Sequence, residues 1–265
     1  MTLKEAVELQ KEPFLQSLAE SIRIRSVQEP PAMAPHTAPM SANALTTPWL
    51  CQRDSVSAPL ILITRMGWCE FGEGDEMIAV LGHLDVVPEG EGWTFDPFSG
   101  EIRDGKIFGR GSMDDKGPTM AALYAMAALR DSGLPLKRRI RILFGTNEET
   151  GSNDMKYYKS HGGELPVMGF TPDGEYPVIN GEKGIINVNY EADYTQTGDV
   201  RLTKISGGSA PNVVPASARA EITCPDDMKP QLMVLAAGCD RITCTETADG
   251  FEILANGVSA HGASP

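Results

Sequence analysis

The chain has 265 residues, 41% of them hydrophobic, and its 36 acidic against 23 basic side chains give a formal net charge of −13. So acidic a surface repels nucleic acid and anionic membranes, and we expect neither as a partner. With no apolar run of about 18 residues and no disulfide or zinc spacing among its five cysteines, the chain is expected to be cytoplasmic, with reduced thiols and about two domains.

Predicted helices and strands alternate through the first part of the chain. They are a helix over 3–22, a buried strand over 77–84, a hairpin turning at Asp104-Gly105, a helix with Pro118 at its first position, a strand over 138–146 and a helix from Gly151. This alternation predicts a layered α/β domain around a largely buried sheet.

Two stretches depart from this pattern. Residues 29–65 are rich in Pro, Ala, Ser and Thr and follow neither a helical nor a strand period, so we expect irregular structure there. Beyond Gly184 the predicted elements are strands over 185–194, 218–224 and 250–257 and a helix over 226–238. We therefore expect a first domain over 1–183 and the beginning of a smaller α+β domain over 184–265.

Polar side chains at the ends of the predicted elements need an explanation, because they are costly to bury without partners. His83 and Asp85 lie two residues apart at a strand end, so they project to the same side, where a carboxylate can orient an imidazole toward a metal. A simple hydrogen-bonded pair is the alternative. Asp114 and Asp115 stand together before a predicted helix, and their repulsion favours a compensating cation, although helix capping explains one of them.

Three further carboxylates follow predicted strands. Glu148 and Glu149 come directly after the strand over 138–146, at the sheet edge where ligands usually bind, unless the loop is merely an exposed acidic one. Asp173 precedes a glycine, which is also typical of an ordinary turn. One imidazole with several carboxylates suits zinc, with manganese or cobalt as substitutes.

Five motifs, in order between residues 82 and 218, resemble those of the zinc-dependent aminoacylase and carnosinase superfamily, and most of all its PepV-type dipeptidases. The motifs are GHLDVVPEGEGWTFDPFSG, GKIFGRGSMDDKGP, FGTNEETGS, FTPDGEYPVINGEKG and SGGSAPNVVPASA. The resemblance implies a zinc-exopeptidase-like catalytic domain with a layered α/β/α sheet, followed by the start of a ferredoxin-like lid domain.

The resemblance also implies a site with two zinc ions bridged by Asp114, after which the peptide bond to Asp115 is typically cis. His83 and Asp173 would complete one set of ligands. Glu149 and a histidine near the family's C-terminus would complete the other.

Further roles follow from the same resemblance. Asp85 would clamp the His83 ring, and Glu148 would be the general base that takes a proton from the attacking water. Asn212 would contact the substrate, and His261 would stabilise the oxyanion.

The chain departs from the family in two respects. Among its four histidines, His36 and His161 match no ligand position, so the second histidine ligand and an arginine that grips the substrate carboxylate would lie beyond residue 265. We expect roughly the first half of an enzyme, with a missing C-terminal segment or a homo-oligomer as possible partners. The family's helix and strand are also absent from 29–65, where we hypothesise a divergent or frame-shifted stretch between Pro31 and Arg65.

Three functions stay open at this stage. The first is a metal-dependent dipeptidase acting on short peptides, with activity impaired by truncation. The second is a deacylase, such as a desuccinylase or an N-acyl-amino-acid hydrolase, because the same metal chemistry serves both. The third is a non-catalytic metal-binding fragment.

Overall fold

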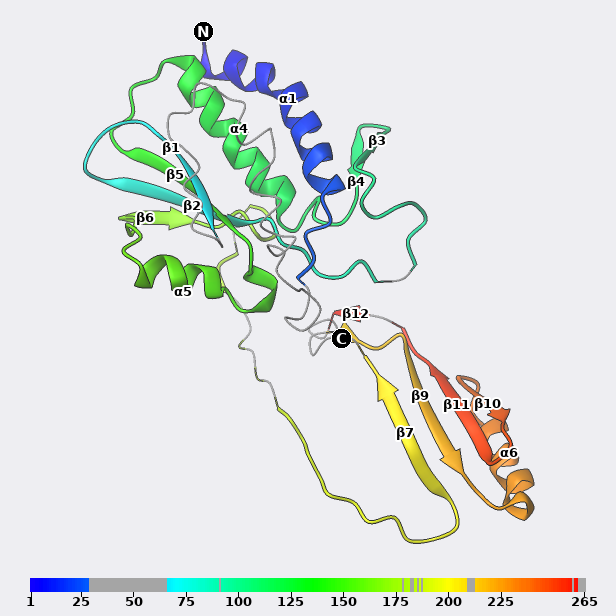
Figure 1. Cartoon of the computed structure of the whole chain (residues 1–265). Coiled ribbons are helices and arrows are strands. Elements are labelled where there is room, and N and C mark those ends of the chain that lie inside the picture. Colours follow the sequence, from blue (N-terminus) through cyan, green and yellow to red (C-terminus); the bar gives the residue numbers. More distant parts are fainter. Residues whose placement is uncertain are drawn as a thin grey trace. The chain divides into compact units, whose positions relative to one another are not determined.

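The computed structural model describes residues 1–28, 66–90, 92–177, 179–181, 184, 186, 188–208, 213–258 and 260–261. The segment 29–65 therefore lies outside the described residues. The chain divides into two units, Met1–Gly181 and Glu182–Pro265 (Figure 1). None of the described helices is long and apolar enough to cross a membrane.

The first unit is built on a four-stranded sheet. Its strands are β1 (Gly67–Phe71), β2 (Met77–His83), β5 (Arg139–Gly145) and β6 (Met168–Phe170), in the order β1-β5-β2-β6. β2 runs parallel to both β5 and β6, whereas β1 is antiparallel to β5. The carboxyl ends of β2, β5 and β6 therefore meet at one edge of the sheet.

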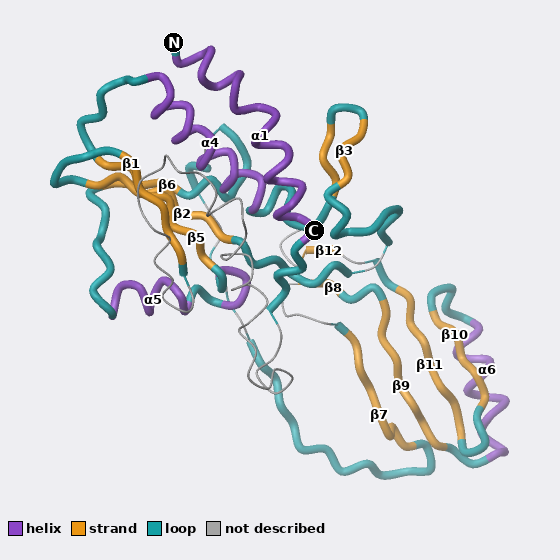
Figure 2. Tube along the Cα trace, turned by 45° about the horizontal axis from the view of Figure 1, so that its top comes forward, coloured by secondary structure: helices purple, strands orange, loops and turns teal. Residues whose placement is uncertain are grey.

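Helices cover both faces of this sheet. α1 (Leu3–Arg23) and α4 (Lys116–Ser132) lie side by side over one face, and α5 (Asn153–Ser160) lies over the other (Figures 1 and 2). Side chains alternate along the strands to fill both interfaces. Phe144 packs with Leu18 and Met120 beneath α1 and α4, while Leu143 packs with Tyr158 of α5. The α/β/α layering expected from the sequence is confirmed.

Local signals explain where several elements begin and end. Thr2 and Glu5 form a reciprocal capping box at the start of α1, with Glu5 Oε2 accepting from the Thr2 N–H at 2.8 Å. The predicted hairpin is formed by β3 (Glu101–Arg103) and β4 (Lys106–Phe108). Both of its turn residues have positive φ, 53° at Asp104 and 71° at Gly105, as a two-residue hairpin turn requires.

The start of α4 differs from the sequence prediction. The helix begins at Lys116, so Pro118 is its third residue and not its first. The N–H groups of the whole first turn lack partners within a helix, so a proline is tolerated there as well. Gly117, in the same turn, instead donates its N–H to the carbonyl of Gly111 at 3.2 Å.

The second unit contains a four-stranded antiparallel sheet with one helix. Its elements are β7 (Arg201–Gly207), β8 (Val213–Val214), β9 (Ser217–Thr223), a 3₁₀ turn (Asp226–Met228), α6 (Lys229–Ala237), β10 (Ile242–Glu246), β11 (Gly250–Asn256) and β12 (Ala260–His261). The sheet order is β10-β11-β9-β7, and β12 pairs with β8 in a separate ribbon. The expected strands at 218–224 and 250–257 and the helix at 226–238 are present.

One predicted strand of this unit is wrong. Where described, residues 185–194 form no strand, and Val188 and Tyr190 are exposed, Tyr190 by 92%. A strand needs a neighbour that pairs with its backbone groups. β7, which the sequence did not predict, takes the edge of β9 instead.

Candidate metal centre

Five candidate residues gather at the carboxyl edge of the central sheet. His83 is the last residue of β2, and Asp173 follows β6. Glu148 and Glu149 stand in a 3₁₀ turn directly after β5, and Asp114 lies two residues before α4. Parallel strands explain the gathering, because their carboxyl ends open into the same crevice, where ligands of open α/β sheets bind.

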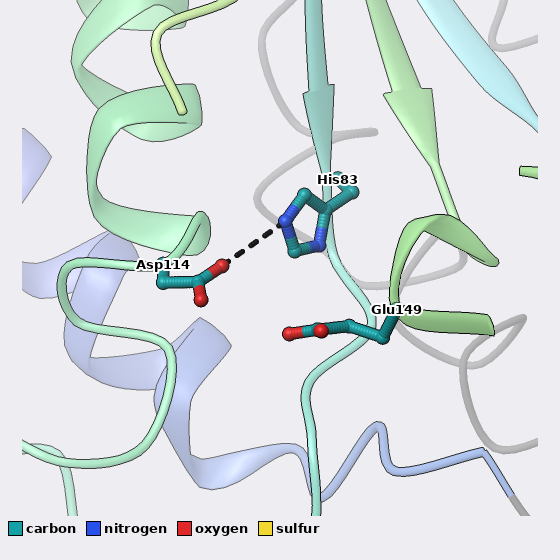
Figure 3. Close-up of side chains that lie close together, drawn as sticks. All are labelled: His83, Asp114 and Glu149. Carbon is teal, nitrogen blue, oxygen red and sulfur yellow. Dashed lines mark ion pairs between the residues drawn. The ribbon is translucent and has the colours of Figure 1, made fainter. Parts of the chain in front are cut away.

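The imidazole of His83 lies at the centre of this group. Its Nε2 atom is 3.1 Å from Asp114 Oδ1, 3.4 Å from Asp173 Oδ2 and 3.9 Å from Glu148 Oε2. Two overlapping sets have ligand atoms within 4.8 Å of one another, namely His83–Asp114–Glu149 and His83–Glu148–Asp173. Figure 3 shows the first set, with the Asp114 and Glu149 carboxylates on two sides of the ring.

Two buried atoms of this cluster form no hydrogen bond of regular geometry among the described residues, although carboxylates lie close to the first of them. They are Nε2 of His83, whose residue is 2% exposed, and Oε1 of Glu149. Such buried polar atoms are uncommon and indicate an absent ion or water. Because the donors are one imidazole nitrogen and several carboxylate oxygens, the set fits a zinc ion, with manganese or cobalt as substitutes.

Asp85 contacts both His83 and the turn that carries the two glutamates. The Nδ1 atom of His83 lies 2.9 Å from the Asp85 backbone oxygen and 3.5 Å from its Oδ1. The expected contact with the ring is thus made most closely by the main chain. The fully buried Asp85 carboxylate instead accepts from the N–H groups of Glu148 and Glu149, both at 3.2 Å.

Two residues outside the expected ligand set, Asp115 and Gly82, also shape the site. Asp115 is fully buried, and its Oδ2 accepts from the His83 N–H at 3.1 Å and from the Thr119 hydroxyl at 2.8 Å. The Asp114–Asp115 peptide bond is cis. Gly82 leaves the room for this contact, since a Cβ there would lie 1.9 Å from Thr119 Oγ1. The position of Gly82 inside a buried strand is the sequence signal for this close contact.

The electrostatics of the site follow from burial and crowding of carboxylates. Burial raises the pKa of Glu149 to about 7, with the Asp114 charge adding to the effect. Burial also raises the pKa of Glu148 and takes that of Asp115 to about 7. Burial opposes protonation of His83, but the adjacent carboxylates of Asp114 and Asp173 outweigh it and raise the His83 pKa. The site therefore attracts positive charge.

The substrate-binding candidates are not placed by the structure. Asn212 lies outside the described residues, as does His36. His261 is in β12, where its backbone pairs with Val213, and its side chain is not described. His161 stacks on Tyr157 at the end of α5, with ring centroids 3.7 Å apart.

Known proteins resemble this chain over the part that carries the cluster. Residues 79–240 match the model of Peptidase family M20/M25/M40. The chain is 47% identical over 163 residues to YtjP of Bacillus subtilis and 47% identical over 162 residues to the Beta-Ala-Xaa dipeptidase of Lactobacillus delbrueckii subsp. lactis. The matches cover 60% of this chain but only 35% and 34% of those proteins.

A solved structure shares the fold. Human carnosine dipeptidase 1 aligns with a TM-score of 0.51 and 23% identity, over 66% of this chain and 42% of its own. The family match spans more than half of the 265 residues. This chain therefore belongs to peptidase family M20/M25/M40.

Proposed function

We propose that the chain carries the metal-binding part of a dipeptidase that hydrolyses the amide bond of short peptides. The observation that carries the proposal is the gathering of carboxylates around the buried His83 imidazole at the sheet edge, where His83 Nε2 and Glu149 Oε1 form no hydrogen bond of regular geometry. The similarity to the Beta-Ala-Xaa dipeptidase supports a small peptide as substrate. In this proposal residues 1–183 are the catalytic domain and 184–265 belong to a lid.

In the proposed centre the two ligand sets share Asp114, whereas the two groups of atoms that lie within 4.8 Å of one another share His83. His83, Asp114 and Asp173 would hold one ion, and Asp114 with Glu149 would take part in holding a second. Zinc is the ion that these donors fit best. When bound, such an ion supplies a Lewis acid that polarises the peptide carbonyl and makes water more acidic.

Glu148 is the proposed general base. Burial and the neighbouring charges of Asp173 and Asp85 raise its pKa above the ordinary glutamate value, which makes the carboxylate a better proton acceptor. Glu148 takes a proton from the attacking water as the new C–O bond forms. It then passes that proton to the amide nitrogen as the C–N bond breaks. Its side chain is 50% exposed, so a substrate can reach it.

Substrate binding is assigned to the second unit. Asn212 and His261 are the proposed contacts, the latter with the oxyanion. With His83 and Asp173 assigned to the first ion, this proposal leaves Asp114 and Glu149 among the described residues for the second. We therefore expect the 265-residue chain by itself to turn over substrate weakly.

The test combines metal content with a substrate panel. The purified chain is loaded with Zn²⁺, Mn²⁺ or Co²⁺ and assayed with a β-Ala-Xaa dipeptide, an N-acetyl amino acid and an N-succinyl amino acid. We expect hydrolysis of the dipeptide, and a loss of roughly 10²- to 10⁴-fold in Glu148→Gln with metal binding retained. Glu73→Gln, an exposed glutamate outside the cluster, is the matched control.

The outcomes separate the three candidate functions. Cleavage of the acylated amino acids alone would identify a deacylase. Metal uptake without any hydrolysis would identify a metal-binding fragment. Full dipeptidase activity in Glu148→Gln would remove that residue from its proposed role.

A further inference from the structure

A single segment of chain, Ser21–Gln28, contacts three parts of the site: the start of α4, the chain after β2 and the chain after β5. It comprises the last turn of α1 and the five residues after it, and we name it the brace. Ser21, Ser26 and Val27 are buried, with Ser21 and Ser26 fully so, whereas Ile24 and Gln28 are partly buried. The mechanism proposed above uses none of these residues.

The first contact joins the brace to the start of α4. Lys116, the first residue of α4, is completely buried. Its Nζ atom donates to the carbonyl oxygens of Ser21 and Ile24, both at 2.8 Å. Lys116 follows Asp114 by two residues, so this clamp fixes the backbone that presents the shared carboxylate.

The second contact joins the brace to the chain after β2. The Ser26 hydroxyl donates to the carbonyl oxygen of Leu84 at 2.5 Å, and the Val86 N–H donates to the Ser26 carbonyl oxygen at 3.2 Å. Val27 and Val86 also form a parallel bridge. The residues held in this way lie on either side of Asp85.

The third contact reaches the chain after β5. The side-chain amide of Gln28 donates to the carbonyl oxygen of Thr146, two residues before Glu148. The brace therefore binds the loops of His83, Asp114 and Glu148 at once, although these loops come from distant parts of the sequence.

Helix capping alone is a weak explanation for Lys116. A cation at the C-terminus of α1 does stabilise the helix dipole and its free carbonyl groups. Exposed side chains achieve this without removing an ammonium group from water, which is costly. The complete burial of Lys116 is explained if its two hydrogen bonds to carbonyl oxygens fix the position of α4 relative to α1.

We propose that Lys116 and Ser26 are positioning residues, which set the spacing between the loops of the metal centre and thereby its affinity for metal. The inference rests on the proposed function in so far as that function takes the centre to bind a divalent ion. Neither side chain touches the ligand atoms. Both act on the backbone that carries them.

The test compares Lys116→Met and Ser26→Ala with the wild-type 265-residue chain. Each is titrated with Co²⁺, and the visible absorption of the bound ion reports affinity and ligand geometry without relying on hydrolysis. We expect about 10- to 100-fold weaker binding, as for other residues that orient metal ligands, together with an altered spectrum. Lys229→Met is the matched control, because its Nζ contacts the carbonyl oxygens of Thr247 and Ala248 in the other unit, at 3.4 and 3.3 Å.

Thermal unfolding of the metal-free chains separates positioning from stability. Lower thermal stability with wild-type cobalt affinity and spectrum, in either variant, would overturn the inference. If Lys116→Met does not fold, the smaller change Ser26→Ala decides by the same criterion. A wild-type chain that binds cobalt but hydrolyses no dipeptide would count against the proposed function, while the cobalt comparison would still decide the inference.

Discussion

The carboxylate of Asp85 binds the main chain of Glu149: its Oδ2 accepts the Glu149 N–H at 3.2 Å, and its Oδ1 accepts that of Glu148 at the same distance. The second residue after β2 thereby fixes the turn after β5. Because the carboxylate is fully buried, both N–H groups are directed at a charge that water does not screen. The two glutamates are thus held in place by a side chain next to His83.

Asp85→Asn tests this relationship. The substitution keeps the shape but leaves one oxygen to serve two N–H groups, so the turn with Glu148 and Glu149 should loosen. We expect metal affinity and hydrolysis to fall by about 10- to 100-fold. Cobalt titration and dipeptide assays measure the effect, and unchanged values in both would show that the turn holds its position without Asp85.

Gly82→Ala should destabilise the first unit. The new Cβ would lie 1.9 Å from Thr119 Oγ1 and 2.8 Å from Asp115 Oδ2, so these side chains or the backbone must shift. We expect a loss of about 1–3 kcal/mol in the free energy of unfolding, measured by denaturant titration. Gly238→Ala, where the nearest atom is 3.5 Å from the new Cβ, is the control and should change little. Equal effects of the two substitutions would contradict the predicted clash.

Glu164 should contribute to stability in a pH-dependent manner. Its carboxylate forms ion pairs with Arg139 at 2.5 Å and Arg141 at 3.1 Å, and the bond to Arg139 lowers its pKa in the folded chain. Since the folded pKa lies below that of the unfolded chain, the stabilisation is complete above the ordinary glutamate value and disappears as the pH falls through the folded one.

Thermal unfolding of Glu164→Gln across pH checks this direction. We expect a lower melting temperature than wild type at neutral pH, with the difference shrinking in acid. The difference should be modest, because the glutamate side chain is 42% exposed. Glu73→Gln serves as the control. If the difference in melting temperature between Glu164→Gln and wild type grew in acid, the pKa of Glu164 would be raised and not lowered by folding.

Cys69 should resist thiol reagents in the folded chain. The residue lies in β1, and burial raises the pKa of its thiol to about 12. Little thiolate is therefore present at pH 8, and the thiolate is the reactive form. We expect the exposed Cys239 to be labelled first and Cys69 only on unfolding, as followed by mass spectrometry of the labelled peptides. Rapid labelling of Cys69 in the native chain would show that β1 opens readily.

The sequence by itself determined the elements whose signals are local, and the types of side chain at the site. Helical spacing over 3–22, the Asp104-Gly105 turn and the apolar run 77–84 each depend on neighbouring residues, and each corresponds to an element of the structure. The carboxyl ends of parallel strands share an edge, so His83, Glu148 and Asp173 could be expected together. The roles proposed for Asn212 and His261 stay predictions.

Tertiary structure alone decided which atoms meet. Asp85 turns its carboxylate to residues 63 and 64 positions away, and Lys116 reaches Ser21 across 95 positions. Likewise, β7 and not 185–194 pairs with β9. A buried polar group or a strand edge is satisfied by whichever partner the packed fold brings near it. Such partners are distant in sequence, so no local pattern of residues records them.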